Sequence, residues 1–338
     1  MTDRADAIRD FLLRAGWADA ARDPLPSDAS FRRYVRLRSS RESVMLMDAP
    51  PPQENVRPYL VVARRLTALG YSAPRIFAED VERGLLLIED FGDATYTREL
   101  AAGVDEASLY AAAIDLLIDL HRQAGPWDHE IPAYDDERLL AEAALLVDWF
   151  LPALTGHDTS PDARAEFLGL WRSLLPEARR VPETLVLRDY HVDNLMRLPA
   201  RQGIAACGLL DFQDAVIGPV TYDLVSLLED ARRDIAPSLV AAMLRRYLEA
   251  FPELDEKTFH ASYAILGAQR NAKIVGIFTR LDRRDGKPQY LAHIPRVWRL
   301  LESDLRHPVL APMRAWFDRY VPREQRIAPP PARRGSPA

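Results

Sequence analysis

The segment LVLRDYHVDNLM, residues 185–196, and the segment GLLDFQDA, residues 208–215, decide the fold and chemistry expected of this chain. They belong to two strand-like runs, ETLVLRD and IAACGLLDF, which flank a turn at PARQG. This pattern predicts a hairpin that brings Asn194 and Asp211 close together. It also places Asp189 at the end of a strand.

The spacing of three oxygen-bearing side chains indicates phosphoryl transfer. That reaction needs an acceptor hydroxyl in line with a terminal phosphate, a group that accepts its proton, and magnesium held against phosphate oxygens. Asp189 is the candidate catalytic base, and Asn194 and Asp211 supply the oxygen ligands that magnesium (Mg2+) prefers. Asp and Asn also cap turns, and one such pair alone would fit that role equally well. The complete set in its strand and turn context favours catalysis.

Outward from this hairpin, the chain changes character at about residue 90. Residues 1–90 alternate short apolar runs, typical of strands, with one helical pattern, VRPYLVVARRLTALG, and this predicts a small β-rich lobe. Residues 91–327 are mostly long helical patterns interrupted by the hairpin, which predicts a larger helical lobe. The Pro-rich stretch 328–338 predicts a disordered tail.

Composition excludes several classes of protein. The chain has 338 residues with a formal charge of -6, so no overall basic field attracts a nucleic acid. The one cysteine, Cys207, excludes an internal disulfide framework and fits a reducing compartment. No stretch has the apolar length of a membrane span. We therefore expect a cytoplasmic protein with no membrane or nucleic-acid partner. A monomer is expected as well.

The motifs resemble those of a known fold family. Arg188-Asp189 followed by Asn194 resembles the catalytic loop of kinases, and Asp211-Phe212-Gln213 resembles their metal-binding triplet. Over residues 20–305, the order of sheet and helix resembles the aminoglycoside phosphotransferase and choline kinase-like family. The resemblance implies an α+β, protein-kinase-like fold of two lobes, with ATP as co-substrate. It also implies that Asp223 braces the catalytic loop.

Within that family, several stretches resemble the bacterial anomeric sugar kinases of cell-wall recycling. The stretches are DASFRRY, LMDAPP, LRDYHVDN, LLDFQDAVIGP and LGAQRNAKIVGIFTRL. This resemblance implies that the acceptor is the C1 hydroxyl of N-acetylmuramate or N-acetylglucosamine, in peptidoglycan recycling.

The nucleotide site departs from the kinase pattern. The strand after the phosphate-covering loop reads VMLMDA, so Met45 or Met47 stands where kinases carry a lysine, and no lysine occurs before Lys257. The covering loop, SDASFRRY, has no glycine. We expect Ser30 and one arginine of the pair Arg32 and Arg33 to take over phosphate binding. Solvent exposure or a surface ion pair is the alternative for each arginine.

Two further groups of residues complete the expected site. The backbone of Glu89 and Phe91, between the lobes, is the expected partner of the adenine edge. The acceptor site is expected to draw on the triplet segment and on one stretch of helix, with the residues Gln213, Asp214, Gln269, Arg270 and Lys273. A cation among the last three would suit a lactyl carboxylate. A solvated helix face is the alternative.

Two other functions remain open from the sequence. An aminoglycoside- or choline-type kinase would need acids for a cationic acceptor, and DDERLLAE at 135–142 offers them. A nucleotide-binding regulator without catalysis would fit the missing strand lysine. Retention of Asp189, Asn194 and Asp211 argues against a regulator, because a binding module has no need of a base.

Overall fold

The computed structural model describes residues 4–26, 31–123 and 130–332. The chain forms two compact units. Of the described residues, the first, here the sheet unit, contains 4–26, 31–119, 130–131 and 192–215, and the second, the helical unit, contains 120–123, 132–191 and 216–332. The chain therefore enters the sheet unit after His191 and leaves it after Ala215. The lobe boundary expected at residue 90 stays a prediction.

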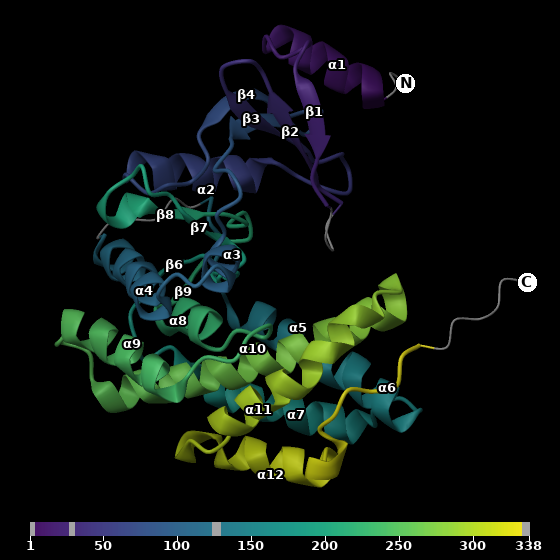
Figure 1. Ribbon diagram of the computed structural model, residues 1–338. Helices are drawn as coiled ribbons and strands as arrows, with labels where there is room; N and C mark the ends of the chain where they lie inside the picture. The colour runs from purple at the N-terminus through teal and green to yellow at the C-terminus, as the bar shows by residue number, and fades with distance from the viewer. Residues whose placement is uncertain (1–3, 27–30, 124–129, 333–338) are drawn as a thin grey trace, which may run out of the picture. The chain divides into compact units, whose positions relative to one another are not determined.

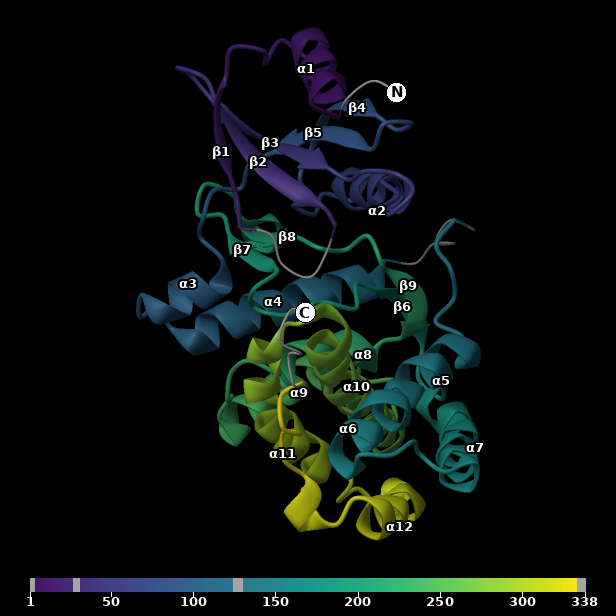
Figure 2. The same ribbon diagram turned by 90° about the vertical axis from the view of Figure 1, so that its right-hand side faces the viewer.

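A five-stranded antiparallel sheet in the order β1-β2-β3-β5-β4 forms the centre of the sheet unit. The elements of this unit are α1 (Arg4–Arg14), β1 (Ala21–Pro24), β2 (Arg33–Arg38), β3 (Ser43–Asp48), α2 (Arg57–Ala68), β4 (Ile76–Asp80), β5 (Leu85–Glu89), α3 (Tyr96–Ala101), most of α4 (Glu106–Arg122), β7 (Leu195–Arg197), η2 (Gly203–Ala206) and β8 (Cys207–Leu209). Leu37, Leu46 and Leu87 pack against α1 on one face. Because side chains alternate along a strand, Tyr34 and Met47 face the other side, where α2 lies (Figures 1 and 2).

The helical unit is built around one long, buried helix, α10. Its elements are α5 (Asp136–Leu145), η1 (Leu146–Phe150), α6 (Leu151–Thr155), α7 (Pro161–Ala178), β6 (Glu183–Val186), β9 (Val216–Pro219), α8 (Thr221–Leu228), α9 (Pro237–Ala250), α10 (Glu256–Asp285), η3 (Pro288–His293), α11 (Ile294–Asp304), η4 (Pro308–Leu310), α12 (Ala311–Tyr320) and η5 (Arg323–Gln325). Helices α5, α7, α8 and α11 pack around α10 (Figure 1). Trp171, Trp298 and Trp316 are buried in this core.

The strand pairing differs from the hairpin predicted between ETLVLRD and IAACGLLDF. Strand β6 pairs with β9, whereas β7 pairs with β8 to form the hairpin. The prediction was wrong for the first strand because LMR at residues 195–197 supplies a closer partner for β8 across the PARQG turn. Strand β6 finds its partner only beyond the hairpin, which a local pattern does not reveal.

The C-terminal stretch is described only as far as Ala332. The Ala332 N–H donates to Asp282 Oδ2 at 2.9 Å, and Arg283 Nη2 donates to the Pro330 carbonyl at 2.7 Å. Residues 328–332 therefore lie against the end of α10, and residues 333–338 of the expected tail lie outside the described residues. Within the described ranges, no helix is long and apolar enough to cross a membrane.

Two helical glycines have very different surroundings. A Cβ on Gly276 of α10 would lie 2.4 Å from the Leu145 carbonyl oxygen, whereas a Cβ on Gly169 of α7 would meet nothing within 4 Å. We expect Gly276→Ala to lower the free energy of unfolding by about 2–3 kcal/mol, because it forces two packed backbones apart. Gly169→Ala should raise it by about 0.5–1 kcal/mol, because alanine favours a helix.

Urea unfolding of both variants beside the parent protein measures these opposite shifts. Equal shifts of the midpoint in the same direction would contradict the close packing of α10 on Leu145.

Candidate active site

In the helical unit, α8 holds the backbone that leads into Asp189. The buried Asp223 carboxylate accepts the N–H of Leu187 at 2.6 Å and of Arg188 at 2.9 Å. Ser226 Oγ donates to the Arg188 carbonyl at 2.9 Å. Arg188 has a φ of 69°, in the left-handed region that is costly for a residue other than glycine. These bonds fix a strained turn directly before the expected catalytic base.

The electrostatic surroundings of Asp189 favour its ionised form. Desolvation raises its pKa, but the opposing positive charges, of which Lys273 is the largest, hold the pKa below its usual range. Asp189 is thus a carboxylate at neutral pH, as a proton acceptor must be. Asp223 differs, because complete burial raises its pKa to about 7 despite its two amide donors.

Glu142 of α5 joins the residues around Asp189 into a cluster of charges. Its carboxylate forms an ion pair with Arg188 and lies 3.1 Å from Lys273 Nζ. The Tyr134 hydroxyl donates to Glu142, and the Arg188 guanidinium lies 5.3 Å from the centre of the Tyr134 ring. Burial raises the pKa of Glu142, but Lys273 and Arg188 outweigh it and lower the pKa.

Sequence reasoning grouped Glu142 with other acids and missed this role. A signal was present, because Glu142 falls three residues after the buried Leu139 and one before the buried Ala143, on the apolar face of α5. Two of the other acids of that stretch have separate partners. Asp135 caps α5 by accepting the Arg138 N–H at 2.9 Å. Asp136 forms an ion pair with Arg179, which directly follows α7.

The expected acceptor residues of α10 lie on its buried side. Gln269 is fully buried, and its amide donates to the Leu139 carbonyl at 2.9 Å. Arg270 Nη2 donates to Ser226 Oγ at 2.9 Å, and so supports the hydroxyl that holds the Arg188 carbonyl. Lys273, the third of these residues, forms the ion pair with Glu142 described above. The solvated helix face considered above does not describe these positions.

In the sheet unit, Asn194 and Asp211 lie at the same end of the β7–β8 hairpin. Leu195 is opposite Leu209, and the Leu210 N–H donates to the Asn194 carbonyl at 2.9 Å. Asp211 has a φ of 56°, and its Oδ1 accepts from Gln213 Nε2 at 3.0 Å. The hairpin therefore places the two backbones side by side, with the Asp211 carboxylate held by its neighbour.

Two other residues of this triplet segment are placed by the same unit. The Phe212 ring stacks on Tyr59 of α2, with centroids 5.0 Å apart. The Gln213 amide also donates to Asp214 Oδ2 at 3.2 Å, so it links the carboxylates on either side of it. Asp214 is exposed.

The structure separates the two arginines of the covering segment. Arg32 lies beside Glu54 and Asp211, whereas Arg33 is exposed at the start of β2. Met45 and Met47, at the expected lysine positions of β3, are buried. Ser30 lies outside the described residues.

The segment of Glu89 and Phe91, which is expected to bind the adenine edge, contacts two arginines. The Glu89 N–H donates to the Arg75 carbonyl at 2.8 Å, and the Glu89 carboxylate lies 2.6 Å from Arg201 Nη2. The Arg201 guanidinium lies 5.0 Å from the centre of the Phe91 ring. Sequence reasoning missed the buried Arg36, whose guanidinium lies within ion-pair distance of Asp90 and Asp93.

The donor set of the hairpin suits a hard divalent cation. Within the described ranges, no three His, Cys, Asp or Glu side chains come together as a metal site. Magnesium commonly takes one or two protein oxygens and completes its shell with water and phosphate. Asp211, with a side chain 45% exposed, and Asn194 offer that number of oxygens.

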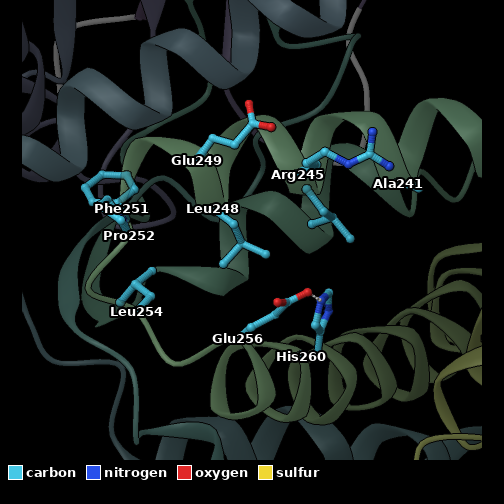
Figure 3. A pocket seen from close by; sticks show the side chains of 10 residues that line it. Ala241, Arg245, Leu248, Glu249, Phe251, Pro252, Leu254, Glu256 and His260 are labelled. Atoms are coloured by element: carbon cyan, nitrogen blue, oxygen red, sulfur yellow. Dashed lines mark ion pairs between the residues drawn. The ribbon is translucent and has the colours of Figure 1, made fainter.

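A cavity of about 520 Å³ in the helical unit contains none of the expected site residues. It lies between α9 and the start of α10 (Figure 3). Its lining includes the apolar side chains of Leu248, Phe251 and Leu254 and the charged side chains of Arg245 and Glu256. Its lining is separate from the residues around Asp189.

Comparison with known proteins gives three results. Residues 22–256 match the model of the phosphotransferase enzyme family, APH. An N-acetylmuramate/N-acetylglucosamine kinase of Caulobacter vibrioides is 39% identical over 96% of this chain and 99% of its own length, and one of Pseudomonas aeruginosa is 39% identical over 90% of each. A choline kinase from Streptococcus pneumoniae has a TM-score of 0.64 at 12% identity, over 90% of this chain and 99% of that chain. This likeness confirms the expected α+β kinase-like fold class.

Proposed function

The chain belongs to the APH phosphotransferase enzyme family, and from this premise we propose that it is an ATP-dependent N-acetylmuramate/N-acetylglucosamine kinase. The phosphorylated group is the anomeric C1 hydroxyl, and the products are the sugar 1-phosphate and ADP. Similarity over nearly the full length to kinases of that name carries this proposal. The role in peptidoglycan recycling, a cytoplasmic location and a monomeric state belong to the same proposal.

The residues around the strained turn suit the acceptor half of the reaction. The sugar hydroxyl oxygen attacks the terminal phosphorus, the bond to the ADP oxygen breaks, and the hydroxyl proton passes to Asp189. No covalent enzyme intermediate is needed, because positioning and charge neutralisation supply the rate. Asp223 accepts the N–H groups of Leu187 and Arg188, Ser226 donates to the Arg188 carbonyl, and these bonds fix the turn that carries this base.

The residues at the end of the hairpin suit the nucleotide half. Asn194 and Asp211 would hold magnesium, which when bound neutralises phosphate charge. Gln213 orients the Asp211 carboxylate through its hydrogen bond. Arg32 supplies the positive charge that a strand lysine supplies in other kinases, and Arg33 does not.

The candidate sugar contact of the helical unit is Lys273, and those of the sheet unit are Gln213 and Asp214. Gln269 and Arg270 instead support the backbone around them, because both are buried with internal partners.

The alternative of an aminoglycoside- or choline-type kinase loses its main support. Its cationic acceptor needs available acids, whereas Glu142 is occupied by Arg188 and Lys273, and Asp135 and Asp136 have partners of their own. Of the four acids of that stretch, the exposed Glu137 alone has no such contact in the described residues. No contact in the described part of the chain favours a regulator without catalysis.

An assay with purified protein, ATP and magnesium tests the proposal against these alternatives. N-acetylmuramate, N-acetylglucosamine, an aminoglycoside and choline are offered separately, and ADP release is measured. We expect release with the two amino sugars and a 1-phosphate signal by phosphorus NMR. Release with the cationic acceptors alone, or with none of the four, would overturn the proposal.

The pH dependence of the reaction should report the influence of Lys273 on Asp189. The base works as a carboxylate, so kcat/KM falls as the pH drops through its pKa. Lys273→Met removes the largest of the charges that lower this pKa. The pKa then rises, and the acid limb of the pH profile moves to higher pH.

Profiles of kcat/KM for the parent and Lys273→Met, carried below pH 4 so that they include the acid limb of the parent, measure this displacement. Lys257→Met, an exposed position at the start of the same helix, is the matched control and should keep the parent profile. An acid limb that stays in place, or moves to lower pH, would contradict the assignment of Lys273.

A further inference from the structure

One arginine of the sheet unit lies between two carboxylates. Arg32 Nε is 3.4 Å from Glu54 Oε2, and Arg32 Nη2 is 3.9 Å from Asp211 Oδ1. The Arg32 and Glu54 side chains are only 13% and 18% exposed, so solvent screens this pair less than a surface pair. The guanidinium therefore lies next to the carboxylate assigned to magnesium, with Glu54 behind it.

Glu54 fixes the backbone as well as the side chain. Its other oxygen, Oε1, accepts the Phe31 N–H at 3.2 Å. One carboxylate thus binds two successive residues at the end of the covering segment. The bond to the Phe31 N–H holds the Glu54 carboxylate in place, and the ion pair of that carboxylate with Arg32 Nε then directs the Arg32 side chain.

Tyr34 adds a third contact on the same face of the sheet. Its side chain is hydrogen-bonded to Arg32, and burial, the largest influence, raises its pKa to about 12. Tyr34 is directly opposite Met47 in the ladder between β2 and β3. The face on which a strand lysine would lie therefore carries an apolar side chain on β3, and its cation comes from the segment before β2.

We propose that Glu54 is a positioning residue for the nucleotide, which holds Arg32 beside Asp211 so that its guanidinium binds the phosphates. The ion pair of Arg32 and Glu54 thus takes the place of the strand lysine that binds the phosphates in other kinases. The inference rests on the proposed function only in that the chain binds ATP with magnesium. The identity of the sugar does not enter it.

Calorimetric binding of a non-hydrolysable ATP analogue, with magnesium and without sugar, tests the inference. We expect Arg32→Ala and Glu54→Gln each to raise Kd by about tenfold. The double variant should be no weaker than Arg32→Ala, because Glu54 acts through Arg32 and the two effects are not additive. Arg33→Ala should bind as the parent does.

Glu79→Gln is the matched control for loss of an ion-paired acid in the same unit. Glu79 pairs with Arg64 on the surface of α2, so the variant should keep the parent Kd. Circular dichroism and Tm confirm that each variant folds, and Glu54→Asp replaces Glu54→Gln should that variant not fold.

Two results would overturn the role of Glu54. One is a Kd of Glu54→Gln within twofold of the parent. The other is a double variant whose effect equals the product of the two single effects, which would mean that Glu54 acts independently of Arg32. Binding is measured without an acceptor, so failure of the sugar assay leaves this test intact.

Discussion

Asp189→Asn is expected to lower kcat for sugar phosphorylation by about 10³-fold, near the middle of the range for a lost general base. Asparagine has the shape of aspartate but cannot take the hydroxyl proton. The backbone before it should remain in place, because Asp223 and Ser226 hold Arg188 through main-chain atoms. The loss should therefore appear in kcat, while the affinity for the nucleotide stays close to that of the parent.

Steady-state assays with N-acetylglucosamine, together with nucleotide binding, measure the two quantities. Asp234→Asn is the control, because Asp234 is an exposed acid of the same unit that pairs with Arg296 and Arg299. It should keep the parent kcat. Turnover of Asp189→Asn within tenfold of the parent would contradict its role as the base.

The hairpin that joins Asn194 and Asp211 was predicted from sequence only in part, because its first strand was assigned to ETLVLRD instead of residues 195–197. Asn194 and Asp211 flank two short apolar runs separated by a turn, and a hairpin of this kind depends on neighbouring residues alone. The pairing of Leu195 with Leu209 in this hairpin places Asn194 and Asp211 side by side. The resemblance to kinases implied that Asp223 braces the catalytic loop. In the structure, its carboxylate accepts hydrogen bonds from two backbone N–H groups of that loop.

The long-range ion pairs were not predictable in the same way. Glu142 is 46 residues from Arg188, and Arg36 is 54 residues from Asp90. Nothing in the sequence near an arginine says which distant carboxylate will face it. Arg32 directly precedes β2 and Arg33 begins it, so extended backbone would point their side chains to opposite faces, but only the position of Glu54 decides which of them is held.

Asp211→Asn is expected to lower kcat by about 10²–10³-fold at a magnesium concentration that saturates the parent, since loss of metal-based charge stabilisation costs several kcal/mol. A neutral amide is a weaker ligand for a hard cation than a carboxylate is. The variant should therefore also need more magnesium for half-maximal nucleotide binding. Magnesium titrations at fixed ATP measure this shift, with Asp23→Asn, an exposed acid of β1, as control.

Asp211→Asn also distinguishes the effect of magnesium on the phosphates from that of the Arg32 guanidinium. Asp211→Asn removes one of the two carboxylates near Arg32, so the guanidinium keeps Glu54 as its partner. A metal role for Asp211 predicts that added magnesium restores part of the lost binding, whereas Arg32→Ala, which lacks the cation itself, is not restored. If Asp211 served only to orient Arg32, both variants would respond to magnesium alike, because neither would have lost a metal ligand. The difference between the two titrations therefore assigns the metal to Asp211 and the phosphate charge to Arg32.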